Sequence, residues 1–292
     1  MSQDVSDNPA PGDPNSAKGQ NSYAILWNRD LRLYLAGRLV AALGQQMFAM
    51  AVGWELYERT GSALALGLVG LTQMVPMLLF TLPAGHLADN YSRKRIIVLG
   101  GIGMALASLG MTLISALAAP VVWIYVCLFV GGATRTFMWA AATSFLPHLV
   151  ERKVLSRAVA WNASMFQISA IVGPSAAGAF IGLVGHHAAP VYALNAVAAL
   201  ASCVLIGMIR REHTVAVKDP MNLRALLTGF SFVLSKRIVL GIITLDMFAV
   251  LLGGAAALLP IYAKDILRAG PTGLGLLQTA MPLGAVLCTF LS

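Results

Sequence analysis

The chain has 292 residues, of which 58% are apolar and only 11% are charged, and its formal net charge is +8. Soluble domains usually carry about 25% charged residues, so this composition excludes a soluble globular protein and predicts an all-α protein that crosses a membrane several times. The positive charge does not indicate nucleic-acid binding. The cations are concentrated in alternate loops between apolar segments, which is the pattern of membrane topology.

Residues 1–22 are polar and contain Pro9, Pro11 and Pro14 but no apolar core. We expect this segment to be a disordered cytoplasmic tail and not a cleavable signal peptide. The rest of the chain contains eight apolar segments that approach or exceed the roughly 20 residues a helix needs to span a bilayer. These expected spans are 33–57, 63–87, 96–117, 120–146, 156–184, 188–209, 238–262 and 273–292.

We expect a six-helix transmembrane bundle in residues 23–209, a cytoplasmic linker in 210–237 and a partial second bundle in 238–292. Within the linker, residues 222–235 either form an amphipathic helix at the membrane surface or remain a plain connection. Because the chain ends inside an apolar helix, about where a second charged turn is expected, a fragment or truncated product is favoured over a natural eight-span protein.

The distribution of Lys and Arg predicts the orientation. The N-terminal segment and the loops after the second, fourth and sixth spans hold 15 of the 20 cations, whereas the opposite loops hold three. This asymmetry places the N-terminus in the cytoplasm of a multi-pass protein, which we assign to a bacterial inner membrane. Aromatic side chains near the predicted outer span ends suit an interfacial belt: Trp54, Tyr57, Trp123, Tyr125 and Tyr262.

A short charged turn, Gly85–Arg95, joins the second and third spans. Asp89 ends the second span, where a carboxylate opposes the helix dipole and needs a partner, either Arg93 or the N-terminus of a neighbouring helix. Gly85 allows a close approach of another helix. A cytoplasmic gate formed by Asp89 is favoured over a surface turn that only fixes topology, whereas Lys94 and Arg95 suit the topological role.

Ionisable and polar residues inside the spans are candidates for solute handling. Arg135 lies at mid-span, where an arginine costs about 2.5–3.5 kcal/mol on insertion scales, so it must face a cavity or pair with a carboxylate. Arg38 is nearer the inner end, where snorkelling is an equal alternative. Asp246 is the only carboxylate well inside a span, because Glu55 suits the outer surface. Asn162, Gln167 and Asn195 either line a path or, as we favour, bond between helices.

The fifth span contains Gly173-Pro174 and, further on, Gly178, which predict a kinked helix with a small face for close packing. No phosphate-binding loop, zinc motif or nucleophile elbow occurs, so we expect no enzyme, cofactor or metal site.

The charged turn resembles the signature loop of the major facilitator superfamily. It matches at Gly85, Asp89, Arg93 and Lys94, and departs at Asn90, where a basic residue is expected, and at Ser92, where Gly is expected. Arg135 is similar to the basic residue of the fourth span, and Gly173, Pro174 and Gly178 are similar to the antiporter motif. With Leu245-Asp246-Met247-Phe248, these features resemble the efflux branch that contains the enterobactin exporter.

The resemblance implies a major facilitator fold in which two bundles rock about a substrate site at mid-membrane. It implies proton-coupled export of amphipathic small molecules of the drug or siderophore class. Branch members commonly have Asp where this chain has Gln45, so proton exchange shifts to Asp246, while Arg135 tunes it or holds an anionic substrate. Partners are then substrate, protons and lipid, with no obligate protein. Uptake and a transport-incompetent fragment remain alternatives.

Overall fold

The structure is a computed structural model that describes residues 28–151, 154–185, 187–210, 240–241, 244–245 and 254–291. The expected tail, residues 211–237 of the linker, most of the expected span at 238–262, and Asp246 lie outside these residues. Every element that the described part contains is a helix. These are α1 (Arg29–Thr60), α2 (Ala63–Asn90), α3 (Arg93–Ala116), α4 (Val122–Leu149), α5 (Leu155–Leu183), α6 (Ala189–Gly207), η3 (Gly254–Leu258), α9 (Leu259–Ile261), η4 (Tyr262–Ile266) and α10 (Gly270–Leu291).

Seven of these helices, α1 to α6 and α10, are long and apolar enough to cross a membrane. The prediction of a multi-span helical protein is therefore confirmed. The arrangement of six plus two spans stays a prediction, because most of the seventh expected span is not described. Its last residues form a short 3₁₀ turn, a short helix and a π-helical turn.

Local signals explain where α1 begins and ends. The side chain of Asn28 accepts a hydrogen bond from the backbone N–H of Asp30 at 3.0 Å, which caps the helix, and the acidic Asp30 suits the positive end of the dipole. At the other end Gly61 adopts a left-handed conformation with φ of 60°, and its N–H bonds the Tyr57 carbonyl at 2.9 Å. The helix is consequently longer at both ends than the expected span.

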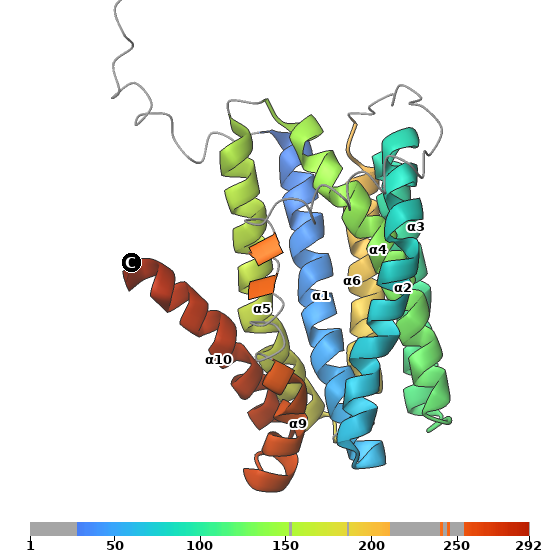
Figure 1. The fold of residues 1–292 in the computed structure, drawn as a ribbon, viewed down its shortest axis with the longest axis vertical. Helices are drawn as coiled ribbons and strands as arrows, with labels where there is room; N and C mark the ends of the chain where they lie inside the picture. Colours follow the sequence, from blue (N-terminus) through green and yellow to red (C-terminus); the bar gives the residue numbers. More distant parts are fainter. Residues whose placement is uncertain are drawn as a thin grey trace, which may run out of the picture.

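Successive helices run in opposite directions, and the neighbours in the bundle include both antiparallel and parallel pairs (Figure 1). Helix α1 lies against α5 and α6, α3 lies against α6 and α4, and α2 lies against α4. Helix α10 lies against α5 on the opposite side from α1, and it crosses α5 at an angle in Figure 1. The packing therefore runs from α10 through α5, α1, α6, α3 and α4 to α2.

Two apolar clusters fill the two ends of the bundle. We call the end with the α2–α3 turn the hinge end; its cluster contains the fully buried Leu31, Tyr34 and Leu149. We call the opposite end the far end; its cluster contains Met50, Met111 and other buried apolar side chains of α1, α3, α4, α5 and α6. The middle of the bundle lies between these clusters, and only Met104, Ala105 and Ala199 form a small apolar cluster there.

The outer faces of the bundle are apolar. On α3, the exposed Leu99, Leu106 and Leu113 are spaced by seven residues and form one stripe, and each is at least 63% exposed. Such a face suits lipid, because a helix satisfies its own backbone hydrogen bonds and needs no water there. Trp123 and Tyr262 are also exposed, as an interfacial belt requires. Trp54 and Tyr57 are buried inside the bundle, so the expectation that they belong to this belt is wrong.

Helices α5 and α10 approach closely through small residues. A Cβ atom added to Gly178 would overlap the carbonyl oxygen of Pro271, and one added to Gly275 would overlap that of Pro174. Gly173 plays the same part on the other side of α5, where α1 lies. The Thr279 hydroxyl lies 3.1 Å from the Ile171 carbonyl, so the contact is polar as well as close. The close packing that the sequence predicts for α5 is therefore present in the structure.

We predict that Gly178→Ala lowers the apparent unfolding free energy by about 1–3 kcal/mol, because the methyl group overpacks the α5–α10 contact. Gly67→Ala is the matched control: a Cβ at Gly67 in α2 meets nothing within 4 Å, so the higher helix propensity of alanine should stabilise by up to about 1 kcal/mol. Thermal unfolding in detergent, followed by circular dichroism, measures both. Equal effects of the two substitutions would contradict the close contact.

Candidate functional site

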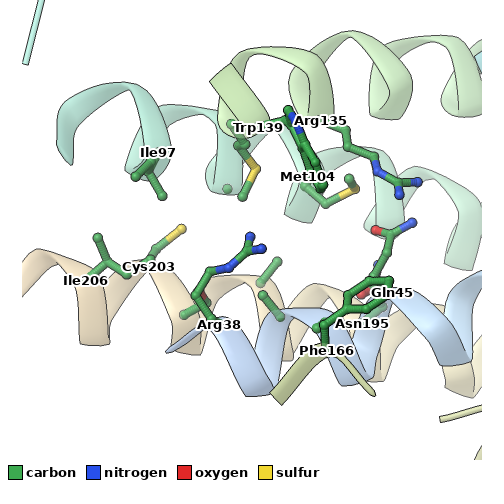
Figure 2. Close-up of a pocket in the computed structure, with 16 residues that line it drawn as sticks. Arg38, Gln45, Ile97, Met104, Arg135, Trp139, Phe166, Asn195, Cys203 and Ile206 are labelled. Carbon is green, nitrogen blue, oxygen red and sulfur yellow. The ribbon is translucent and has the colours of Figure 1, made fainter. Parts of the chain in front are cut away.

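Polar side chains converge in the middle of the bundle, between the two apolar clusters. A cavity of about 90 Å³ lies among α1, α3, α4, α5 and α6 (Figure 2). Its polar lining consists of two arginines, two amides and a hydroxyl, and the rest is largely apolar. The polar lining residues are Arg38, Gln45, Arg135, Asn195 and Ser202.

A larger cavity, of about 570 Å³, lies between α2 and α4. Arg135 and Trp139 line both cavities, and a very small third cavity shares Gln45 with the smaller one, Gln73 with the larger one and Arg135 with both. Because Arg135 stands fourteenth of the 28 residues of α4, this junction lies at mid-helix. The remaining lining of the larger cavity is mostly apolar with two threonines: Gly70, Met74, Met77, Thr81, Gly132, Thr136 and Ala140.

The side chains of Arg38 and Arg135 point from opposite helices into the space between them, and the side chains of Gln45 and Arg135 point toward one another (Figure 2). The two guanidinium groups repel each other across this space. The Nε atom of Arg38 is buried and has no hydrogen-bond partner in the described part. The site therefore presents two positive groups, and one of them has an unused donor.

The structure thus brings together three of the four predicted coupling residues: Arg38, Gln45 and Arg135. The fourth, Asp246, lies outside the described residues. Asn195 is buried and donates to the Ser108 hydroxyl at 2.7 Å, and Gln167 donates to the Pro282 carbonyl at 2.8 Å. Both amides therefore make the interhelical hydrogen bonds that the sequence favoured, and Asn195 lines the smaller cavity as well.

At the hinge end, only Tyr91 and Ser92 separate α2 from α3. Asp89 is exposed in the last turn of α2, and the Nε atom of Arg93 donates to the Ala88 carbonyl at 3.3 Å and not to the Asp89 carboxylate. Of the two candidate partners of Asp89, Arg93 is therefore not paired with it in this conformation. A Cβ at Gly85 would meet nothing within 4 Å, so no described helix approaches it closely.

Lys94 has a structural contact that the sequence did not predict. Its Nζ atom donates to the Ile209 carbonyl at 2.6 Å, just beyond the end of α6. A cation there complements the negative end of the α6 dipole and satisfies one of its last carbonyl groups. This contact ties the α2–α3 turn to the end of α6, which supplements the topological role expected for Lys94.

A second polar network closes the far end. Glu55 is buried and pairs with Arg59 at 3.1 Å, while Arg59 also donates to the Ala119 carbonyl. The sequence placed Glu55 at the outer surface, and the structure corrects this, because α1 turns its carboxylate inward toward the α3–α4 connection. The i, i+4 spacing of Glu55 and Arg59 was the available signal for this ion pair.

The far-end network continues from α1 to η4. The Tyr57 hydroxyl donates to Asp265, and the ammonium group of Lys264 lies 5.6 Å from the centre of the Tyr57 ring, over its face. Both partners lie in η4, a π-helical turn. Turns of this kind are rare in proteins as a whole, but they occur often at functional sites. The α1–η4 contact therefore holds the far end of α1 against a segment some 200 residues later in the chain.

Residues 34–292 match the sequence pattern of the Major Facilitator Superfamily. The chain belongs to this superfamily. Its members are transporters and not enzymes. The polar junction at mid-helix is thus the candidate solute site of a superfamily protein.

Relatives in the superfamily include efflux proteins. The chain is 23% identical to macrolide efflux protein A of Streptococcus pyogenes over 89% of its own length and 65% of the relative. It is 28% identical to multidrug efflux pump Tap of Mycobacterium tuberculosis over 80% and 58%, and 20% identical to the staphyloferrin A transporter of Staphylococcus aureus over 88% and 65%. The chain therefore spans less than two thirds of the length of these curated relatives.

Sequence reasoning missed Gln73, which lines the larger cavity of this superfamily protein together with Arg135. Its signal was available: Gln73 is the only amide in the charge-free segment 63–84. The small junction cavity places it beside Gln45 and Arg135, so three polar side chains of α1, α2 and α4 meet at one level.

We predict that Glu55→Gln lowers the free energy of unfolding of this protein by about 3 kcal/mol, because it leaves Arg59 without its counter-charge in a mostly buried position. The double substitution Glu55→Gln/Arg59→Gln should cost less than the sum of the single ones. Thermal unfolding in detergent tests this, with Glu58→Gln, an exposed neighbour, as the control. Additive losses would exclude a coupled pair.

Proposed function

We propose that the chain moves amphipathic small molecules, of the drug or siderophore class, out of the cell by alternating access and in exchange for protons. The observation that carries this proposal is the pair of cavities that share Arg135 at mid-helix, one small and polar and the other larger and mostly apolar. A superfamily transporter needs a solute site at this depth. An amphipathic solute needs both kinds of lining.

The relatives support export as the direction. Two of the three carry efflux in their names, and macrolide and multidrug transport are said of those proteins. The proposal also includes membership of the efflux branch that contains the enterobactin exporter, a bacterial inner membrane, and an N-terminus in the cytoplasm. The hinge end is then the cytoplasmic end and the far end faces outward.

In this proposal Asp246 exchanges the proton, because Gln45 cannot take one up and release it. Arg135 acts on the solute or on Asp246 from α4. Asp89, with Arg93 and Lys94 at the start of α3, belongs to a cytoplasmic gate that forms in another conformation, since Asp89 is free of Arg93 in this one. Gly173, Pro174 and Gly178 hold α5 against its neighbours and limit leakage of protons during exchange.

We predict that inverted membrane vesicles containing the chain accumulate a labelled solute when respiration acidifies their interior, and lose it when a protonophore is added. The panel is ethidium as a cation, erythromycin as a macrolide and fluorescein as an anion. Asp246→Asn should reduce accumulation by at least tenfold, because the proton exchange group is lost, while Glu58→Gln, on the exposed face of α1, should not. The initial rate of solute entry is the measurement.

Three results would contradict the proposal. Absence of movement for every solute would indicate a transport-incompetent chain, and accumulation only in right-side-out vesicles would indicate uptake. Full coupled transport by Asp246→Asn would remove Asp246 from the proton step.

The far-end network suits the closed outer side of such a cycle. We predict that Asp265→Asn opens this side more often, because the Tyr57 hydroxyl loses its charged acceptor. A reporter cysteine at Gly53, which lies 3.5 Å from the Pro260 ring when a Cβ is added, should then react several-fold faster with an impermeant maleimide. The three native cysteines are first replaced by serine, and Glu58→Gln is the control. An unchanged reaction rate would exclude this contact as a gate.

A further inference from the structure

The mid-helix site has an unbalanced charge. The two cavities that meet at Arg135 are lined by the guanidinium groups of Arg38 and Arg135, by the amides of Gln45, Gln73 and Asn195, and by hydroxyl groups. None of their described lining residues is acidic.

Acidic side chains of the described helices lie toward the two ends of the bundle. Glu55 is paired with Arg59 at the far end, and Asp89 is exposed at the hinge end. Asp30, at the start of α1, accepts a hydrogen bond from the backbone N–H of Arg210. Two guanidinium groups that face one another between apolar clusters repel each other, and the half-buried Arg38 is partly shielded from water as well. An anion between them relieves both penalties. It also gives the buried Nε of Arg38 an acceptor.

The shape of the site says which part of a ligand each cavity takes. The arginines line the smaller cavity, whose volume of about 90 Å³ suits a single acidic group. The larger cavity continues from Arg135 along Met74, Met77 and Trp139, and its volume is about 570 Å³. Methionine side chains adapt to differently shaped apolar groups, and the tryptophan offers a flat apolar face.

We propose that Arg38 and Arg135 together select amphipathic solutes that carry an acidic group, with this group held between the two arginines and the apolar body lying along α2 and α4. This inference rests on the proposed transport function and names its substrate class: amphipathic anions, and not the amphipathic cations that a multidrug pump would be expected to take. In this proposal Arg38 helps to select the solute and does not simply extend toward the membrane surface, and Arg135 contacts the solute directly.

Binding of two dyes with related xanthene rings and opposite charge tests the proposal without requiring transport. Fluorescein is an anion and rhodamine 123 a cation at pH 8. The whole chain is placed in nanodiscs of neutral lipid, with empty nanodiscs as the blank, and binding is followed by fluorescence anisotropy. We expect fluorescein to bind at least tenfold more tightly than rhodamine 123.

The variants identify the groups responsible. Arg38→Gln and Arg135→Gln should each weaken fluorescein binding about tenfold, since each removes a charge-assisted hydrogen-bond donor. Each should therefore also bring the affinities for fluorescein and rhodamine 123 closer together. Arg38→Lys and Arg135→Lys keep the charge and should lose much less. Arg32→Gln, an exposed position on the same helix as Arg38, is the matched control and should change nothing. Unfolding temperatures establish that each variant is folded before binding is compared.

Rhodamine 123 binding as tightly as fluorescein would overturn the proposal, as would glutamine variants that are folded and bind fluorescein unchanged. Chloride is the competing source of negative charge. If chloride, compared with gluconate, displaces fluorescein and abolishes its preference, the arginines hold an inorganic anion and the proposal fails.

Transport separates this inference from the proposed function. Vesicles that export ethidium and not fluorescein would keep export and remove the anion assignment. Arginine-dependent fluorescein binding by a chain that moves no solute would keep the recognition site and remove transport.

Discussion

The free-energy cost of placing a guanidinium group in the middle of an apolar helix bundle constrains this molecule more than any other interaction. Arg135 lies midway along α4, and the bundle can keep it there only by leaving space for water or a partner around it. The two cavities that meet at this residue are that space. Apolar side chains fill most of the bundle above and below it, and the buried charge at the far end, Glu55, is paired with Arg59.

Close helix packing elsewhere in the described structure contrasts with the open space around Arg135. Between α5 and α10, glycines bring backbones into close contact. At the far end, Tyr57 and Asp265 join α1 to η4, and Arg59, paired with Glu55, also bonds to the α3–α4 connection. Between α2 and α4, by contrast, a cavity of about 570 Å³ lies beside Arg135.

Much of this arrangement is predictable from the sequence, because membrane spans depend on length and apolar composition alone. The six helices α1 to α6 lie where the long apolar segments predicted them, and Arg135, Arg38 and Gln45 converge as expected of costly or polar residues on facing helices. Glu55 was misplaced because position along a span does not say which way a side chain faces. Asp265 was missed because its partner, Tyr57, lies 208 residues away.

Arg93, one of the two candidate partners of Asp89, does not reach it for a local reason. Asp89 ends α2 and Arg93 begins α3 on either side of a two-residue turn, and the Arg93 side chain is directed back to the Ala88 carbonyl while Asp89 stays exposed. A spacing of four residues brings side chains together only inside one continuous helix, and here the helix is broken between them.

The shortness of that turn has a mechanical consequence. Helix α2 forms one wall of the larger cavity, and α3 carries the leucine stripe that faces lipid. Two residues cannot act as a slack tether, so a tilt of α2 has to be shared by α3, which packs against α6. A widening of the larger cavity at its α2 wall therefore also displaces the leucine face of α3.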